Sequence, residues 1–120
     1  MANVVIVYTT WPDADTAEAV GAEAVAEQLA ACANVEAPIR SIYRWQGAVE
    51  RAAEVAMTLK TTDDAAPALT AFILARHPYE LPCILAWPVD PEISHGDYLD
   101  WVQEQVATPA ISEVGDSEIP

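Results

Sequence analysis

Four side chains of the sequence are of types that bind soft or borderline metal ions, namely Cys32, His77, Glu80 and Cys83. Thiolates suit Cu(I), and imidazole with nitrogen or oxygen partners suits Cu(II). These four side chains are therefore the candidate ligands for a metal ion, which folding itself does not require. Two simpler interpretations stay open. Cys32 is favoured as a small buried side chain at a helix end, because free cysteine is often buried. His77 is able to cap a helix through its imidazole.

A second set of residues is typical of a subunit interface or of a cleft between subunits. The stretch SIYRWQGAVERAAEVAMTLKT crowds aromatic side chains, arginines and a glycine into its first half, and it ends beside the only lysine of the chain. That lysine is expected either to neutralise an anion or to form an interface ion pair, a type of contact that is often energetically small. For the large amphipathic side chains of Tyr79 and Trp101, packing is the favoured role. The set comprises Tyr43, Trp45, Gly47, Glu54, Lys60, Tyr79 and Trp101.

Hydrophobic periodicity predicts the elements that must position these residues. Alternation and β-branched runs favour strands, whereas apolar residues at i, i+3, i+4 and i+7 favour helices. Capping residues and prolines set the helix ends. The predicted elements are a strand at Asn3–Thr10, a helix at Asp15–Cys32, a loop closed by Pro38, strands at Ile39–Gly47 and Glu50–Thr61, a helix capped at Thr62 and ending at His77, a strand at Cys83–Val89, and a short helix opened by Ser94 or Asp97 and reaching Val106.

The predicted order is β-α-β-β-α-β plus a C-terminal helix, which is the ferredoxin-like α+β pattern of an antiparallel sheet with two helices on one face. The two central strands form a hairpin that exceeds the usual strand length of about 5–6 residues. The other face of the sheet would be bare in a single subunit, so we expect oligomerisation to cover it. We assign one domain to residues 1–107 and predict that the aperiodic tail, residues 108–120, is mobile.

Charge and cysteine usage narrow the possible partners and the compartment. Nineteen acidic residues face five basic ones, which gives a formal net charge of −14. Nucleic acids and anionic membranes are therefore excluded as expected partners, because both attract proteins through lysine and arginine. An acidic coat that keeps the protein in solution is the simplest interpretation. Two cysteines without CxxC spacing, and no basic segment near the N-terminus, predict a cytoplasmic location.

Four separated motifs carry a resemblance to a known family. ACANVEAPIRSIYRWQGAVE, EVAMTLKT, RHPYELP and GDYLDWV occur in this order between about Val4 and Val106. Their order and spacing resemble those of the CutA divalent-cation tolerance family. The resemblance implies a ferredoxin-like fold, a homotrimer similar to PII signalling proteins, a link to copper or other divalent metals, and no established catalytic activity. It also points to Cys32 and His77 as ligands, whereas Cys83 stands where many relatives carry an acidic residue.

In such trimers the long hairpin pairs with the sheet of a neighbouring subunit, so the resemblance implies that Tyr43, Trp45 and Gly47 serve assembly. The predicted function is that of a homotrimeric metal-tolerance or signalling-type protein. It would bind divalent cations, or a small ligand in the cleft between subunits, without turnover, and pass a signal to an unknown protein partner. The alternative is a small-molecule-processing enzyme on the same fold. An acylphosphatase-type site is not expected, because residues 1–39 contain no arginine or lysine.

Overall fold

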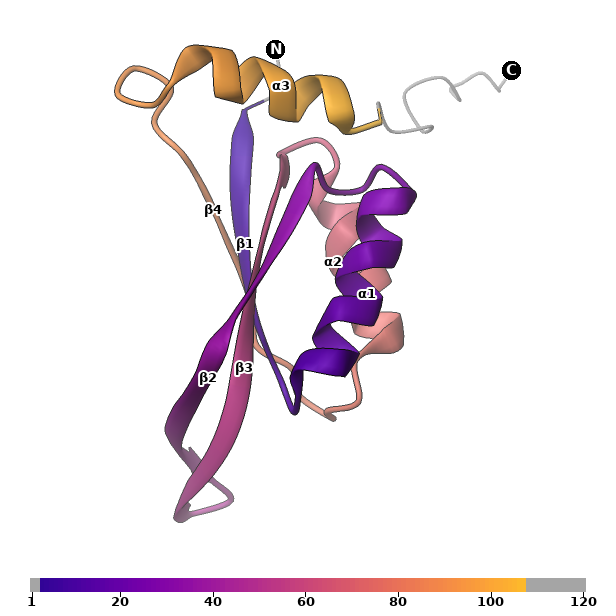
Figure 1. Cartoon of the computed structure of the whole chain (residues 1–120). Helices are drawn as coiled ribbons and strands as arrows, with labels where there is room; N and C mark the ends of the chain where they lie inside the picture. The colour runs from indigo at the N-terminus through magenta and orange to yellow at the C-terminus, as the bar shows by residue number, and fades with distance from the viewer. Residues whose placement is uncertain (1–2, 108–120) are drawn as a thin grey trace, which may run out of the picture.

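The computed structural model describes residues 3–107, and its strands and helices follow the predicted order (Figure 1). The predicted mobile tail at residues 108–120 lies outside the described residues. The elements are β1 (Val4–Trp11), α1 (Ala14–Ala26), β2 (Cys32–Trp45), β3 (Ala48–Thr62), α2 (Ala66–Arg76), β4 (Ile84–Pro88) and α3 (Gly96–Gln105).

The four strands form one antiparallel sheet in the order β2-β3-β1-β4. Helices α1 and α2 lie side by side against one face, and α3 crosses the end of the sheet (Figure 1). This arrangement confirms the predicted ferredoxin-like α+β fold. The opposite face of the sheet carries no helix along most of its length (Figure 1).

The main core lies between the sheet and the first two helices. Strand β1 alternates, so Val5, Val7 and Trp11 point toward the helices, and the Trp11 side chain is completely buried. Helix α1 begins where Asp13 accepts a hydrogen bond from the Thr16 amide at 2.7 Å, and this bond holds the pKa of Asp13 below its usual value. These caps and alternations explain why the body of the subunit folds as the sequence predicts.

Helix α1 packs closely on the sheet because Gly21 has no side chain. A Cβ atom at this position would lie 2.7 Å from the buried Met57 Sδ, which is shorter than a normal contact. The helix also ends earlier than predicted, at Ala26 rather than at Cys32. Gln28 takes a left-handed φ of 61°, and the Ala31 amide donates to the Lys60 carbonyl at 2.8 Å. The chain has therefore already joined the sheet when it reaches Cys32.

The β2–β3 hairpin is longer than the body of the subunit requires. Strand β2 has 14 residues and β3 has 15, and their distal halves project beyond the helices (Figure 1). Strand β2 includes the segment predicted as a loop before Pro38, with a register shift between Val35 and Pro38. At the tip, Gln46 and Gly47 take positive φ angles of 49° and 85°, a combination that suits a tight hairpin turn.

Candidate functional site

Four of the residues predicted from the sequence gather around Thr10, at the end of β1: His77, Tyr79, Glu54 and Cys83. We call these four residues and Thr10 the Thr10 cluster. Strand β1 supplies Thr10, strand β3 supplies Glu54, and the other three come from the segment that leaves α2 and leads into β4. The short connection after α2 returns the chain to the sheet beside β1, because β4 pairs with β1.

Both ring nitrogens of His77 have hydrogen-bond partners within the subunit. Nε2 donates to the Thr10 carbonyl at 2.8 Å, and Nδ1 accepts from the Tyr79 amide at 3.1 Å. The two backbone partners assign the tautomer, because a carbonyl only accepts and an amide only donates. The ring also stacks on Trp11 with centroids 4.1 Å apart. Metal binding through either nitrogen would therefore require one of these hydrogen bonds to break.

Glu54 accepts a hydrogen bond from the Tyr79 hydroxyl at 2.8 Å, and its side chain is buried. Burial, followed by the hydrogen bond to the Glu54 carboxylate, raises the pKa of Tyr79 well above its usual value. Burial also raises the pKa of the Cys83 thiol, although a hydrogen bond with Thr10 acts in the opposite direction. The cluster therefore favours a neutral phenol and a neutral thiol, and its carboxylate is positioned by a hydroxyl donor.

A second group lies at the other end of the same sheet face. Cys32 stands opposite Lys60 in the β2–β3 register, and its Sγ lies 3.5 Å from the Tyr98 hydroxyl of α3. The hydrogen bond with Cys32, together with burial, raises the pKa of Tyr98 to about 12. Lys60 donates to the Asn34 side chain, and Trp101 contacts Tyr98 with ring centroids 5.5 Å apart.

The structure does not bring Cys32 together with His77 and Cys83 in one subunit. Thr10 pairs with Ala56, and Cys32 pairs with Lys60, so the two positions are four residues apart along β3 and on opposite sides of it. At a rise of about 3.3 Å per residue, that offset alone is roughly 13 Å. Within residues 3–107, no three His, Cys, Asp or Glu side chains are grouped closely enough to hold a metal ion.

The remaining predicted residues occupy exposed positions. Glu80 is exposed in the segment after α2, while Tyr43, Trp45 and Gly47 lie near the tip of the hairpin. Tyr43 and Trp45 are 44% and 37% exposed, which is high for aromatic residues in a small domain. Their side chains share the face of the sheet that carries Glu54, because Ile39 pairs with Glu54 and Tyr43 with Glu50.

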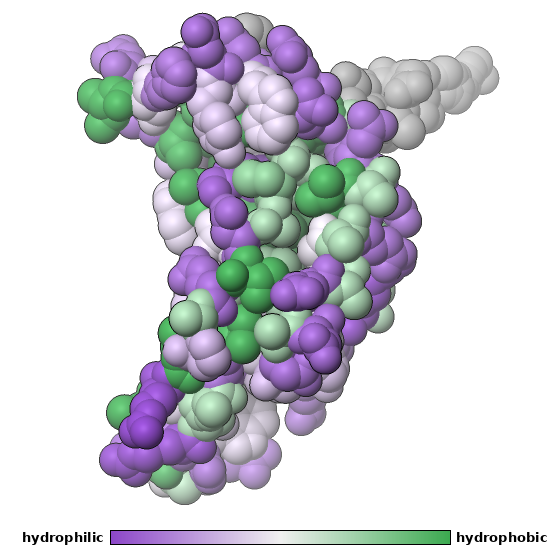
Figure 2. Space-filling model, in the orientation of Figure 1, coloured by the Kyte–Doolittle hydropathy of each residue, from purple (hydrophilic) through white to green (hydrophobic). Residues whose placement is uncertain are grey.

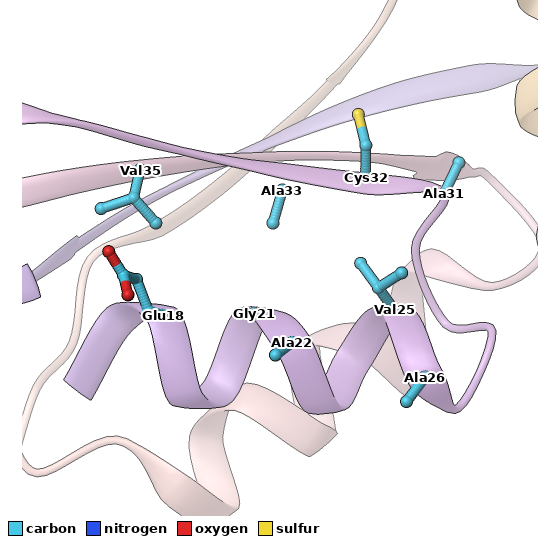
Figure 3. A pocket seen from close by; sticks show the side chains of 9 residues that line it. All are labelled: Glu18, Gly21, Ala22, Val25, Ala26, Ala31, Cys32, Ala33 and Val35. Atoms are coloured by element: carbon cyan, nitrogen blue, oxygen red, sulfur yellow. The ribbon is translucent and has the colours of Figure 1, made fainter. Parts of the chain in front are cut away.

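A shallow, open groove of about 630 Å³ lies between α1 and the first half of β2 (Figure 3). Ala33 and Val35 point toward the helix, whereas the Cys32 sulfur points away from it (Figure 3). Glu18 is the only charged side chain among the residues that line this groove. The groove therefore has little ligand-binding chemistry, and Cys32 faces the opposite surface of the sheet.

Sequence reasoning missed three residues that organise these groups: Thr10, Trp11 and Tyr98. The alternation of β1 beyond Thr10 would have placed Trp11 on the helix-facing side, where it supports the His77 ring. Tyr98 belongs to the predicted last helix, but no sequence pattern indicates that it contacts Cys32. Such contacts between distant segments depend on where α3 crosses the sheet.

A single antiparallel sheet, helices on one face and an extended hairpin place the protein in the ferredoxin-like α+β class. The family model described as CutA1 divalent ion tolerance protein matches residues 5–105. The chain therefore belongs to the CutA1 divalent ion tolerance family, as the sequence motifs predicted.

Known relatives and solved structures agree with this assignment. The divalent-cation tolerance protein CutA of Thermus thermophilus is 39% identical over 99 residues, which are 82% of this chain and 94% of that protein. Its solved structure has a TM-score of 0.82 and covers 87% of this chain and 99% of its own. A structure titled PII-like protein CutA, from Nostoc, has a TM-score of 0.81 at 32% identity and covers 91% of this chain and 100% of its own.

The mouse protein CutA is 37% identical over 94% of this chain, and this chain spans 62% of the length of that relative. A structural neighbour from Archaeoglobus fulgidus, at 35% identity with a TM-score of 0.81, covers 87% of this chain and 99% of its own and is titled a periplasmic divalent cation tolerance protein. Among the described residues, no helix is long and apolar enough to cross a membrane.

Proposed function

We propose that the chain assembles as a homotrimer that binds divalent cations such as copper, or a small ligand, in the clefts between its subunits, without turnover. One observation carries this proposal: the candidate ligands of one subunit are divided between the two ends of a sheet face that has no helix over most of its length. A complete site would then require residues from a second subunit. The family name, divalent ion tolerance, supports cations as the ligand class.

Exposed apolar side chains support assembly on the same face. Leu85 and Trp87 are opposite Tyr8 and Ile6 in the sheet register, and both are about half exposed. With the aromatic residues of the hairpin, they form an apolar surface that a monomer would leave in water, and such surfaces commonly mark interfaces. Among the described strands, β2 and β4 are each paired on one side only, and such edges favour pairing with another chain.

Cys83 is the thiol that the Thr10 cluster offers to a metal ion. It is half-buried, with the Glu54 carboxylate nearby, so the cluster offers a sulfur and an oxygen donor. A neighbouring subunit would supply the remaining ligands, and its Cys32 is one candidate. Because the thiol must lose its proton, and its pKa is raised, the affinity for metal is expected to increase as the pH rises.

The proposal is tested by titrating copper into the protein at two salt concentrations and counting bound ions by native mass spectrometry. We expect about one ion per chain, with binding weakened at least tenfold in Cys83→Ser and Cys32→Ser and unchanged in His95→Ala. His95 is the matched control, because it is an exposed ligand type outside both groups. Equal, salt-sensitive binding by all four proteins would mean that the acidic surface collects the metal, and it would contradict the proposal.

The proposed site of action is the cytoplasm, where both cysteines would remain reduced. The structure has two free cysteines, at positions 32 and 83. Alkylation of both thiols in freshly isolated protein, measured by mass spectrometry, is the expected result. Recovery of the protein from a periplasmic fraction would contradict this location.

A further inference from the structure

The groove between α1 and the first half of β2 is apolar and lies at the surface (Figure 3). Val25 points from the helix toward the strand and is 36% exposed, while Val35 points from the strand toward the helix. Figure 2 shows mostly hydrophobic side chains where α1 adjoins β2. Glu18 is the only charged residue of the lining. An apolar surface of this kind commonly marks a contact with another segment.

After α3 the chain returns to one end of this groove. The Ala107 amide donates to the Gln28 carbonyl at 2.9 Å, and Gln28 belongs to the connection between α1 and β2. Val106 is buried in the same cluster as Ala31, which lines the groove. Ala31 lies at one end of the groove and Glu18 at the other (Figure 3). The chain that follows Ala107 therefore starts at the Ala31 end.

The sequence after Ala107 suits an apolar groove. Its first five residues read TPAIS and carry no charge, and acidic residues begin only at Glu113. In an extended segment, Pro109 and Ile111 project to the same side, because side chains alternate along a strand. That side would present two apolar groups to the groove.

The length of the uncharged segment also matches the groove. On the strand side, the groove extends from Ala31 to Val35, which is roughly 13 Å at a rise of about 3.3 Å per residue. Five extended residues cover about 17 Å at the same rise, so they span the groove. The acidic residues from Glu113 onward would lie beyond it, which avoids the cost of burying their charge.

We infer that residues 108–112 dock in this groove of their own subunit as an extended segment, which runs from the Ala31 end toward Glu18. Docking is intramolecular, because the segment is tethered at Ala107, and a short tether raises the effective concentration to the millimolar range. A contact that would be weak between separate molecules is therefore populated. For these residues the inference departs from the predicted mobile tail.

The docked segment would cover the outer edge of β2 beside the groove. An exposed strand edge invites pairing with foreign chains, and proteins commonly shield such an edge with another segment. Pro109 lacks an amide proton, which suits an edge position. The inference is independent of the proposed assembly, to which it leaves the β4 edge, the projecting hairpin and the opposite face of the sheet.

The test is NMR spectroscopy of the full chain, with ¹⁵N relaxation of residues 110–112 as the first measurement. We expect order parameters above about 0.6, since lower values mark flexible backbone. Ile111→Asp places a charge against the apolar lining, so the values should fall below about 0.6. Val114→Asp is the matched control, because it makes the same kind of change after the first acidic residue, and it should leave them unchanged.

A variant of the groove tests the same contact from the other side. Val25→Gln replaces an apolar group of the lining by a polar one, at an exposed position of α1 where glutamine is a good helix former. It should lower the order parameters of residues 110–112 as Ile111→Asp does. Values below about 0.6 in the wild-type protein, or an equal loss in Ile111→Asp and Val114→Asp, would overturn the inference.

Nuclear Overhauser effects between the methyl groups of Ile111 and Val35 identify the copy that supplies the tail. Labelled chains are refolded together with an excess of unlabelled chains. A contact within one subunit keeps its intensity per labelled chain, whereas a contact between copies loses it, and that loss would overturn the inference. Because a monomer would give the same expected result as a trimer, failure of the proposed assembly and failure of the docked tail are distinguishable.

Discussion

Strand β3 passes through two very different environments, the body of the subunit and the projecting hairpin. From Glu54 to Thr62 its residues are buried or half-buried, and Met57 and Leu59 are completely covered. From Ala48 to Ala53 almost every residue is exposed. The same continuous strand therefore packs against the core of its own subunit in one half, and in the other half it pairs with β2 outside that core. We therefore expect the body to stabilise the subunit and the hairpin to serve a contact outside it.

The largest expected effect is a test of the body. Trp11→Ala removes a completely buried indole that donates to the Thr9 hydroxyl at 2.6 Å and stacks on His77. Replacing such a core residue by alanine costs about 3–5 kcal/mol. Chemical denaturation should show this loss, and the proton signals of His77 should broaden or shift. A free energy of unfolding within about 1 kcal/mol of wild type would show that Trp11 is not central to the core.

The corresponding change in the hairpin is Trp45→Arg. If the aromatic side of the hairpin is buried by a neighbour, an unpaired charge there should cost several kcal/mol and release monomers. Sedimentation velocity measures the change, and circular dichroism should report an unchanged subunit fold. Leu74→Arg, at an exposed apolar residue of α2 outside the proposed interface, is the comparison variant and should leave the assembly intact. An intact trimer of unchanged stability would mean that the hairpin does not serve assembly.

The smallest expected effect concerns the Thr10 cluster. Tyr79→Phe removes the hydroxyl that donates to Glu54, and we expect a loss of about 1 kcal/mol because the site is partly exposed to solvent. The raised pKa of Tyr79 means that its contribution is complete below pH 10 and is lost as the pH rises above that value. The difference between wild type and variant should therefore shrink in alkaline solution.

Tyr43→Phe provides the control for the loss of a phenol hydroxyl at neutral pH. Its hydroxyl lies on the exposed hairpin and makes no hydrogen bond with another described residue. At pH 7 the free energy of unfolding of this variant should lie within about 0.5 kcal/mol of wild type. A Tyr79→Phe variant whose deficit stayed constant as the pH rises above 10 would contradict the proposed role of the phenol.

Local sequence patterns determined the order of the elements and most of their boundaries. Alternation and capping are properties of neighbouring residues, so β1, β3 and the start of α1 were predictable. The early end of α1 was not. Residues 27–32 continue an alanine-rich helical pattern, but a left-handed Gln28 and the hydrogen bond from the Ala31 amide to the Lys60 carbonyl draw them into the sheet. There, tertiary hydrogen bonding outweighed helix propensity.

The sequence by itself determined the fold class, the family motifs, the excess of acidic residues and the unusual length of the hairpin. Only the tertiary structure decided that His77 has both nitrogens engaged beside Thr10, and that Cys32 meets Tyr98 instead of Cys83. It also decided that the chain after α3 returns to the end of α1, because that depends on where α3 crosses the sheet. Periodicity fixes which side of an element a residue occupies. The long-range pairing of strands fixes which distant residues it meets.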